Sequence, residues 1–313
     1  MHPAWPPERP SHGRTREIVS VAIVLPWAIW AVLRATGADD IYPVSAVMAF
    51  TPYAAVGSVA TLLAVIAMRA WRVAVVGLAA AAVLVAIVAG RAFPHSQPDD
   101  RGPVVTVMAA NLHLGTGSAV AVMNAVRRYR VDLMTNEEIT PGEVARLRAN
   151  GLDRALPYGV NESVDGTYGL ALWSRTPIVR TGRVEASIPR YRLLLHVVHP
   201  NPPILPRWSS TWRQTLAGLP SANFDTHGDL RIIAGDFNAT LDDSALRDVI
   251  ARGYADAAER VGAGLTWTWR SGGPLKITID HVLVDRRIRV LSVRTVSIPG
   301  SDHRALIAVL RLP

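Results

Sequence analysis

The sequence predicts an α/β domain that follows an N-terminal membrane segment of three helices. Residues 18–89 are almost free of charged side chains and are dominated by Ala, Val, Leu and Ile. After residue 103, short β-rich apolar runs alternate with stretches of helical spacing, which is the pattern of an α/β domain. Several of these runs end on carboxylate, amide or imidazole side chains, where loops hold functional groups over a rigid scaffold.

Three apolar runs, at 18–33, 44–68 and 73–89, are the candidate membrane helices. A helix needs about twenty residues to cross the hydrocarbon core, so the second run is long enough and the first and third are short. We expect Arg34 and Arg91, at the ends of the short runs, to extend their charged groups to the membrane surface. A signal peptide is the alternative for the first run, but two more apolar runs follow it and no clear cleavage site leads into a soluble chain. The predicted organisation is therefore a tail at 1–17, three transmembrane helices at 18–90, a linker at 91–102 and a catalytic domain at 103–313.

Arginines orient the membrane segment. Arg14 and Arg16 precede the first run, and Arg69 and Arg72 lie between the second and third. The loop between the first and second runs instead carries one arginine and two aspartates, so it has no excess of positive charge. Positive residues mark the cytoplasmic side, so we predict a multi-pass cell-membrane protein with a cytoplasmic N-terminus and an extracytoplasmic catalytic domain.

Composition narrows the class of partner. The chain has no cysteine, and a domain of about 210 residues can bury a large core without disulfides. From Asp100 onward, 26 basic residues face 20 acidic ones, a net charge of +6. A basic surface suits phosphate-bearing partners, either nucleic acid or anionic lipid, and does not choose between them.

The elements of the domain follow from local pattern. Residues 231–234 are predicted to form a buried strand because they are β-branched and stopped by Gly235. Residues 119–130 have helical spacing, and a helix at 244–252 has Asp243 or Ser244 as its cap. The remaining predicted strands lie at 107–111, 132–138, 169–175, 193–198, 282–284 and 306–310, and a further helix at 142–149.

The sequence Gly235-Asp236-Phe237-Asn238, followed by Ile279-Asp280-His281 and Ser301-Asp302-His303, is the main chemical signal. It gathers three carboxylates, a carboxamide and two imidazoles. Hard oxygen ligands without cysteine favour Mg²⁺ or Mn²⁺ over zinc. A neighbouring histidine can accept a proton from water. The pattern indicates metal-assisted hydrolysis.

These motifs, in this order, resemble the endonuclease/exonuclease/phosphatase superfamily, which has the DNase I fold. Residues 107–111 resemble its first strand, and 132–138 resemble its D-I-V-x-L-Q-E strand. Residues 169–175 resemble its G-x-A-x-L-S-R strand, and 196–199 its phosphate-contacting histidine strand. The resemblance covers residues 103–313 and implies a four-layer α/β/β/α sandwich with two mixed sheets.

The resemblance also implies roles. The metal ligands would be Asn111, Glu138 and Asp302, and the catalytic residues would be Asp236, Asn238, Asp280, His303 and His199. Asp236 would orient the nucleophilic water, Asn238 would fix Asp236, and Asp280 would orient His303. Whether His303 accepts a proton or binds phosphate is left open.

Two positions depart from the family pattern. His113 stands where several relatives carry a second aspartate, so the number of metal ions bound, one or two, is left open. Glu137 replaces the usual glutamine before Glu138. Because strand side chains alternate between faces, only one of these two glutamates is expected to face the site.

Substrate-binding candidates come from two segments. The segment 200–220 could bind a base, a sugar or a lipid headgroup, pack on the domain as a loop, or rest in the membrane interface. Of the two tryptophans in 266–269, one is expected to pack and one to line the cleft. The candidates are Arg207, Trp208, Trp212, Arg213 and Trp267.

We therefore predict a membrane-anchored, extracytoplasmic, Mg²⁺-dependent phosphoric ester hydrolase acting on a lipid-linked or other envelope phosphate. The architecture resembles actinobacterial membrane proteins linked to teicoplanin resistance. The alternatives are a nuclease that cleaves extracellular nucleic acid and a non-catalytic envelope-binding module contributing to glycopeptide resistance. The inferred partners are the bilayer and a phosphate ester, and no obligate protein partner is inferred.

Overall fold

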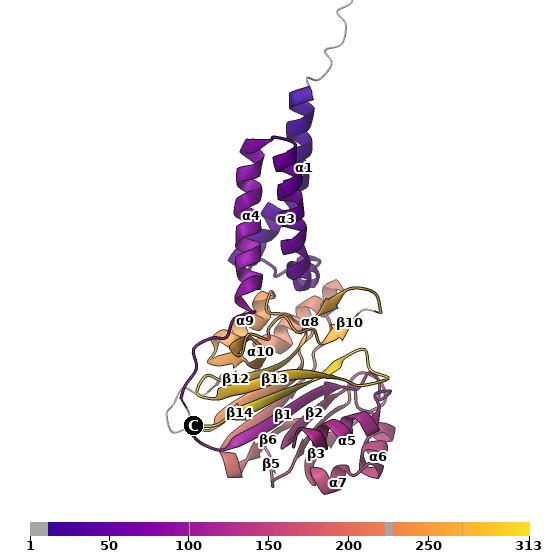
Figure 1. The fold of residues 1–313 in the computed structure, drawn as a ribbon. Coiled ribbons are helices and arrows are strands. Elements are labelled where there is room, and N and C mark those ends of the chain that lie inside the picture. Colours follow the sequence, from indigo (N-terminus) through magenta and orange to yellow (C-terminus); the bar gives the residue numbers. More distant parts are fainter. Residues whose placement is uncertain (1–11, 100, 223–227, 271) are drawn as a thin grey trace, which may run out of the picture. The chain divides into compact units, whose positions relative to one another are not determined.

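The computed structural model describes residues 12–99, 101–222, 228–270 and 272–313 (Figure 1). The chain forms two compact units. The first comprises Met1–Ala38 and Phe50–Ala89, and the second comprises Asp39–Ala49 and Gly90–Pro313. Residues 1–11, which belong to the tail expected in the cytoplasm, lie outside the described residues.

The first unit is helical and apolar. It is built from α1 (His12–Thr36), α3 (Thr51–Ala67) and α4 (Trp71–Gly90). Three helical stretches, 13–36, 44–67 and 71–90, are long and apolar enough to cross a membrane. The second begins with α2 (Val44–Val47) and a 3₁₀ turn, η1 (Met48–Phe50). The first helix extends beyond the apolar run at 18–33 because helical structure continues into polar residues at both ends.

The second unit contains two six-stranded mixed sheets. The first sheet has the order β13 (Arg289–Ser297), β14 (Arg304–Arg311), β1 (Val104–Asn111), β2 (Leu133–Glu137), β4 (Leu170–Ser174) and β3 (Tyr158–Glu162). The second has the order β5 (Val179–Arg180), β6 (Glu185–Ile188), β7 (Leu193–Val198), β8 (Leu230–Asp236), β12 (Asp280–Asp285) and β9 (Tyr254–Asp256). A separate ribbon pairs β10 (Trp269–Arg270) with β11 (Lys276–Ile277).

Three apolar clusters hold the layers together. The central cluster lies between the two sheets and includes Val107 and Ile232. One outer cluster joins the first sheet to α5 (Ala119–Arg128), α6 (Pro141–Ala149) and α7 (Leu152–Ala155). The other joins the second sheet to α8 (Pro206–Ala217) and α9 (Ser244–Ala251). The short α10 (Ala257–Arg260) and the 3₁₀ turn η2 (Pro189–Tyr191) complete the unit. The predicted α/β/β/α sandwich is confirmed.

Helix α8 occupies the segment 200–220, for which a packed loop was one of the expectations. Pro206 stands in its first turn, where a missing N–H costs nothing. Ser209, Trp212 and Leu216 share its buried face at helical spacing. The segment is therefore an amphipathic helix of the outer layer, and its proline marks the helix start.

Two segments of the second unit, Asp39–Ala49 and the residues after Gly90, continue into the apolar helices. Buried polar contacts hold both segments against the rest of this unit. Asp39 Oδ2 accepts the backbone N–H of Ser244 at 2.8 Å, at the start of α9. The Ser45 and Ser209 hydroxyls lie 2.8 Å apart. Arg91 donates two hydrogen bonds to the Asp242 carboxylate, at 2.8 and 2.5 Å. Asp39, a residue from the first interhelical loop, thus binds an N–H at the helix start where Asp243 or Ser244 was expected to cap.

The stretch 91–102, expected as a linker, carries further contacts to the same unit. Gln97 exchanges two hydrogen bonds with the backbone of Val290. His95 N–H donates to Arg260 O at 3.0 Å. Residues 91–97 therefore run along the domain surface.

Arg91→Ala is expected to destabilise the second unit by about 3–5 kcal/mol, because it leaves the Asp242 carboxylate buried and uncompensated. The Arg91 and Asp242 side chains are only 5% and 1% exposed. The free energy of unfolding, followed by tryptophan fluorescence in detergent, measures the loss. Arg289→Ala is the matched control: its pair with Asp99 is solvent-exposed, so about 1 kcal/mol or less is expected. Equal losses for the two variants would contradict a structural role for the buried pair.

Candidate active site

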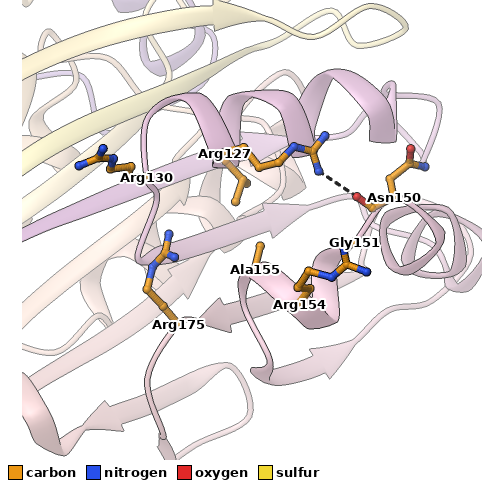
Figure 2. A pocket seen from close by; sticks show the side chains of 8 residues that line it. Arg127, Arg130, Asn150, Gly151, Arg154, Ala155 and Arg175 are labelled. Carbon is orange, nitrogen blue, oxygen red and sulfur yellow. Dashed lines mark hydrogen bonds between the residues drawn. The ribbon is translucent and has the colours of Figure 1, made fainter.

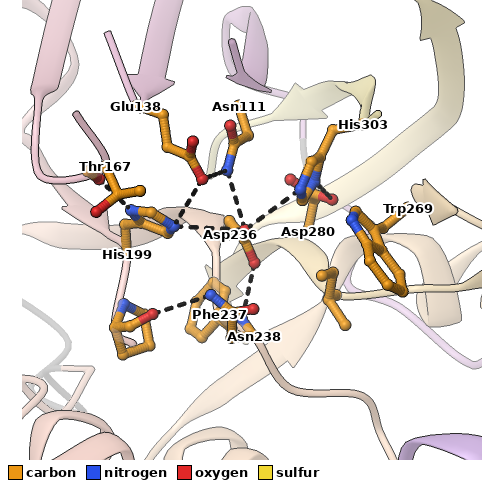
Figure 3. Close-up of polar contacts among 12 residues, drawn as sticks. Asn111, Glu138, Thr167, His199, Asp236, Phe237, Asn238, Trp269, Asp280 and His303 are labelled. Atoms are coloured by element: carbon orange, nitrogen blue, oxygen red, sulfur yellow. Dashed lines mark hydrogen bonds and ion pairs between the residues drawn. The ribbon is translucent and has the colours of Figure 1, made fainter. Parts of the chain in front are cut away.

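The candidate site lies where the ends of the central strands of both sheets meet (Figure 3). Asn111 ends β1, and Asp236 ends β8. Because β12 runs antiparallel to β8, its first residue, Asp280, lies directly opposite Asp236. His303 precedes the first residue of β14. Strand register thus brings together side chains up to 192 positions apart in the sequence.

The backbone around Asp236 is tightly constrained. Gly235 has φ of +142°, and a Cβ there would lie 2.3 Å from Val198 O, so no larger residue fits. Asp236 Oδ1 accepts the backbone N–H of Asn238 at 2.8 Å. The Asn238 side chain donates instead to Pro200 O at 2.9 Å. Asn238 therefore fixes Asp236 through its backbone N–H, and its side chain ties this turn to the loop that follows β7.

Asn111 bridges two carboxylates. Its Nδ2 lies 3.2 Å from Glu138 Oε1 and 3.1 Å from Asp236 Oδ2. Its Oδ1 accepts the backbone N–H of His113 at 2.9 Å. Glu138 Oε2 accepts the N–H of Leu114 at 3.0 Å. The structure thus places Asn111, Glu138 and Asp236 in one hydrogen-bonded group.

Both glutamates of the Glu137–Glu138 pair lie near Asp236, although strand alternation predicted that only one would face the site. Glu137 is fully buried at the end of β2, with Oε1 beside Gly235. Glu138 follows the strand with φ of +53°, and this left-handed conformation ends the alternation. The expectation was wrong because it assumed that extended geometry persists past Glu137.

Two histidines face Asp236 from opposite sides. The Nε2 atoms of His199 and His303 each lie 3.6 Å from Asp236 Oδ2. His199 Nδ1 lies 3.1 Å from Thr167 O, which requires a proton on Nδ1 and leaves Nε2 toward the carboxylates. His303 Nδ1 lies 2.8 Å from Asp280 Oδ2. A carboxylate behind the ring accepts a hydrogen bond from the Nδ1 proton and directs Nε2 of His303 into the site.

Burial and crowded charge shift the pKa values of this group. Burial raises the pKa of Asp236, and the negative charge of Asp280 adds to the rise, while His303 and His199 oppose it. Burial, with the charges of Asp280 and Asp236, also raises the pKa of Glu137 well above its usual range. Burial opposes the charged form of His303, but Asp280 and Asp236 outweigh it and raise the pKa of His303 to about 10. The site favours bound cations and bound protons.

The His303 shift predicts the pH dependence of stability in the metal-free protein. The pKa of His303 rises from about 6.5 unfolded to about 10 folded, so its contribution is fully present below pH 6.5 and is lost as pH rises toward 10. The measurement is the unfolding free energy in EDTA from pH 6 to 10, as the difference between wild type and His303→Gln. A difference that does not shrink with rising pH would contradict the assigned charge.

Asp302 lies at the edge of the group. Its Oδ1 is 2.9 Å from His113 Nδ1, and its Oδ2 accepts the Trp269 indole N–H at 2.9 Å. Asp302 Oδ1 is 3.9 Å from His303 Nε2. Trp269 is therefore the tryptophan of 266–269 that borders the site. The sequence prediction named Trp267 as the substrate contact, whereas the tryptophan that contacts Asp302 is Trp269.

The proposed substrate-binding residues separate into different environments. Trp212 is fully buried and donates its indole N–H to Phe237 O at 3.0 Å, which corrects its assignment as a substrate contact: it supports the turn after Asp236. Arg213 forms an ion pair with Asp40 in the 39–49 segment. Trp267 packs between Lys276 and Arg304, with the charged groups 4.8 and 4.7 Å from its ring. Arg207 stacks on Trp208 at 5.8 Å on the exposed side of α8.

His281 supports the turn from behind. Its Nδ1 lies 2.8 Å from Asp256 Oδ2, and its Nε2 lies 2.9 Å from Ala239 O. Burial opposes its charge, but the hydrogen bond and charge of Asp256 raise the pKa of His281. A protonated imidazole donates from both nitrogens and so joins β9 to the residue after Asn238.

The donor set fits a divalent cation. One atom each from Asp236, Asp280 and His303 can be chosen so that all lie within 4.8 Å of one another. Both oxygens of Glu137 and Oδ1 of Asp280 are buried without a hydrogen-bond partner among the described residues. The Asn111 side chain contacts both Glu138 Oε1 and Asp236 Oδ2. Buried carboxylates in excess of cations, with oxygen and imidazole donors, suit Mg²⁺ or Mn²⁺.

Two packed mixed sheets, with carboxylates and imidazoles gathered at their shared edge, define a phosphoester hydrolase of the DNase I-like type. Residues 108–303 match the model of the Endonuclease/Exonuclease/phosphatase family, and the chain belongs to this family.

Solved structures show the same fold. A humanized D. rerio TDP2 is 16% identical, with a TM-score of 0.50 over 66% of this chain and 99% of that one. An endonuclease/exonuclease/phosphatase from Beutenbergia cavernae is 16% identical, with a TM-score of 0.51 over 67% and 72%. An AP endonuclease from Archaeoglobus fulgidus is 11% identical, with a TM-score of 0.52 over 65% and 98%. A search of curated proteins returned no match.

Proposed function

We propose that this protein is a membrane-anchored phosphoesterase that uses Mg²⁺ or Mn²⁺ outside the cytoplasm and acts on a lipid-linked or other envelope phosphate. One observation carries the choice of a lipid substrate. The turn that bears Asp236 runs directly into residues that hold the segments continuing into the apolar helices.

Only a few residues separate Asp236 from the residues that bind these segments. Asp236 faces the site, and Asp242 and Ser244, six and eight positions further along the chain, bind Arg91 and Asp39. Arg91 follows α4 directly, and Asp39 lies three residues after α1. The catalytic turn therefore belongs to the side of the domain from which the chain enters the membrane segment. For a substrate embedded in the same bilayer, tethering of the enzyme raises the effective concentration.

Exposed apolar side chains support the same choice. Ile41, in the loop after α1, is 69% exposed, and Ile204, before α8, is 56% exposed. Leu205 beside it is also exposed. The loop 200–205 is joined to the catalytic turn through the bond from Asn238 to Pro200 O. Exposed apolar residues near a membrane attachment are suited to the lipid interface.

The chain's residues divide the reaction between them. Asp236, held by the Asn238 N–H, accepts a proton from the attacking water, whose oxygen forms the new P–O bond as the ester P–O bond breaks. His199 and His303 present Nε2 to the phosphoryl group. Asp280 holds the His303 ring in this orientation, and the protonated His303 gives its Nε2 proton to the leaving oxygen. Glu138 and Asn111 would hold the cation. A bound Mg²⁺ or Mn²⁺ would offset the negative charge that develops on the phosphoryl group.

A substrate panel tests this function. The purified full chain in nanodiscs is given polyprenyl phosphates and diphosphates, phospholipids, DNA and RNA with Mg²⁺, and products are quantified. We expect turnover of a lipid-linked phosphate. Hydrolysis of nucleic acid alone would support the nuclease alternative, and binding without turnover would support the envelope-binding module.

The orientation has its own test. A reporter that is active only outside the cytoplasm, fused after Pro313, is expected to be active, because Arg14, Arg16, Arg69 and Arg72 favour a cytoplasmic N-terminus. A reporter active only in the cytoplasm serves as the matched control. Activity of that control alone would reverse the proposed topology.

A further inference from the structure

A basic pocket lies in the α5–α7 layer, outside the site described above (Figure 2). Its volume is about 340 Å³, and its lining comes from the C-terminal end of α5 and the turn after it, from residues 150–155 and from the residue after β4. The charged residues of its lining are Arg127, Arg130, Arg154 and Arg175. We propose that this pocket binds a soluble oligophosphate, meaning a ligand with two or more linked phosphate groups.

The pocket is at the opposite end of the sheet from the candidate active site. Arg175 follows Ser174, which pairs with Leu133 at the start of β2. Glu138 follows the other end of β2. Five strand residues at 3.3 Å each separate the two ends by about 17 Å. A ligand in this pocket therefore does not occupy the catalytic centre.

Two of the four guanidinium groups are held in place. Arg127 donates to Asn150 O at 3.0 Å and to Asn124 Oδ1 at 2.7 Å. Arg175 donates to Asp132 Oδ1 at 3.0 Å and to Val131 O at 2.6 Å. These bonds orient the two side chains before any ligand arrives, which reduces the entropy lost on binding.

The other two arginines have no such partners. The side chains of Arg130 and Arg154 are exposed, and their guanidinium groups make no hydrogen bond or ion pair with another described residue. No aspartate or glutamate lines the pocket. The dipole at the end of α5 favours Arg127 there, but it does not explain why four arginines from separate segments surround one cavity. Permanent like charges at close range are compensated by a bound anion.

The arrangement indicates the kind of anion. Arg127 and Arg154 lie toward the end of the pocket marked by Asn150 and Gly151, and Arg130 and Arg175 lie toward the other end (Figure 2). Guanidinium groups bind phosphate oxygens in a bidentate manner. Positive charge at both ends suits a ligand whose phosphates are spaced along its length, and the volume suits a small molecule.

The place of the pocket in the fold favours a soluble source over a bilayer headgroup. The segments that continue into the apolar helices contact α8 and the start of α9, on the second sheet. The pocket instead belongs to the helices that cover the first sheet. The anion is therefore taken from the aqueous phase. This inference does not depend on the proposed lipid substrate.

Calorimetric binding of inorganic tripolyphosphate to the detergent-purified full chain tests the site. We expect saturable binding that weakens with salt, and a loss of affinity of about fivefold for Arg130→Gln or Arg154→Gln and at least tenfold for both together. Arg128→Gln is the matched control, because Arg128 ends α5 two residues before Arg130 but stacks on Tyr129 outside the pocket, and it should change affinity by less than about twofold. Phosphoester hydrolysis should be unchanged in the double variant, which separates this test from that of the proposed function.

Three outcomes would overturn the proposal. These are no binding of tripolyphosphate by the wild type, equal losses in the Arg128 control and the double variant, and full affinity in the double variant. A further arm uses vesicles of phosphatidylglycerol. Binding to vesicles but not to tripolyphosphate, lost in the double variant, would replace the soluble ligand with a lipid headgroup.

Discussion

Glu138→Ala is expected to abolish magnesium-stimulated hydrolysis while leaving the domain folded. Glu138 Oε1 adjoins Asn111 and lies 3.6 Å from His199 Nε2, so its removal opens the group where a cation would be held. Loss of a few kcal/mol of transition-state stabilisation lowers the rate by about 10³. The measurement is the initial rate over a Mg²⁺ titration, with thermal unfolding as the check on folding.

Glu162→Ala is the control for this variant. Glu162 lies on the edge strand β3, two strands across from Glu137, and pairs with Arg180 instead of a residue of the site, so hydrolysis and its Mg²⁺ dependence should be retained. Wild-type rates for Glu138→Ala, at every Mg²⁺ concentration, would show that Glu138 is not part of a metal site.

Asp280→Asn and His303→Ala are expected to lower kcat by about 10²–10⁴, the range for loss of a positioned proton-transfer group. Asp280 Oδ2 lies 2.8 Å from His303 Nδ1, and both side chains are buried. The asparagine keeps the size of the side chain but removes its charge and can favour the other tautomer. The effect should fall on kcat more than on KM, because the lost charge matters most as charge develops in the transition state.

His196→Ala supplies the control for the histidine variant. His196 lies on the strand that leads to His199, but its Nδ1 faces Glu185 at 3.4 Å. Its kcat should stay within a few-fold of wild type. Equal falls in ligand affinity and kcat for Asp280→Asn would indicate that the pair only holds the fold or the substrate.

Much of the site could be predicted because strand ends carry a readable signal. Apolar runs that stop at Asn111 and Asp236, and one that begins just after Asp280, place these residues on one edge, once their order along the chain indicates the fold. The register of β12 against β8 then sets Asp280 opposite Asp236. The local sequence pattern and the order of the family motifs were together sufficient to place these residues in one site.

Other features depend on long-range packing or on single backbone angles. The left-handed conformation of Glu138 brings both glutamates toward Asp236, and no local pattern predicted it. The contact from Asp39 to Ser244 joins residues 205 positions apart. Trp269 was indistinguishable from Trp267 by alternation alone, because the choice depends on where β10 pairs. The helix at Pro206–Ala217 did carry a signal, since Pro206, Trp212 and Leu216 mark its start and its buried face.

The central claim is that Asp236 and a divalent cation together hydrolyse a lipid-linked phosphate ester. The most direct measurement is product release from a polyprenyl phosphate or diphosphate by the purified full chain in nanodiscs, with Mg²⁺, with excess EDTA and after Mg²⁺ is restored. Wild type is expected to turn over with Mg²⁺, to stop in EDTA and to recover, and Asp236→Asn is expected to be inactive in all three conditions. Equal turnover in EDTA, or turnover by Asp236→Asn at the wild-type rate, would contradict the claim.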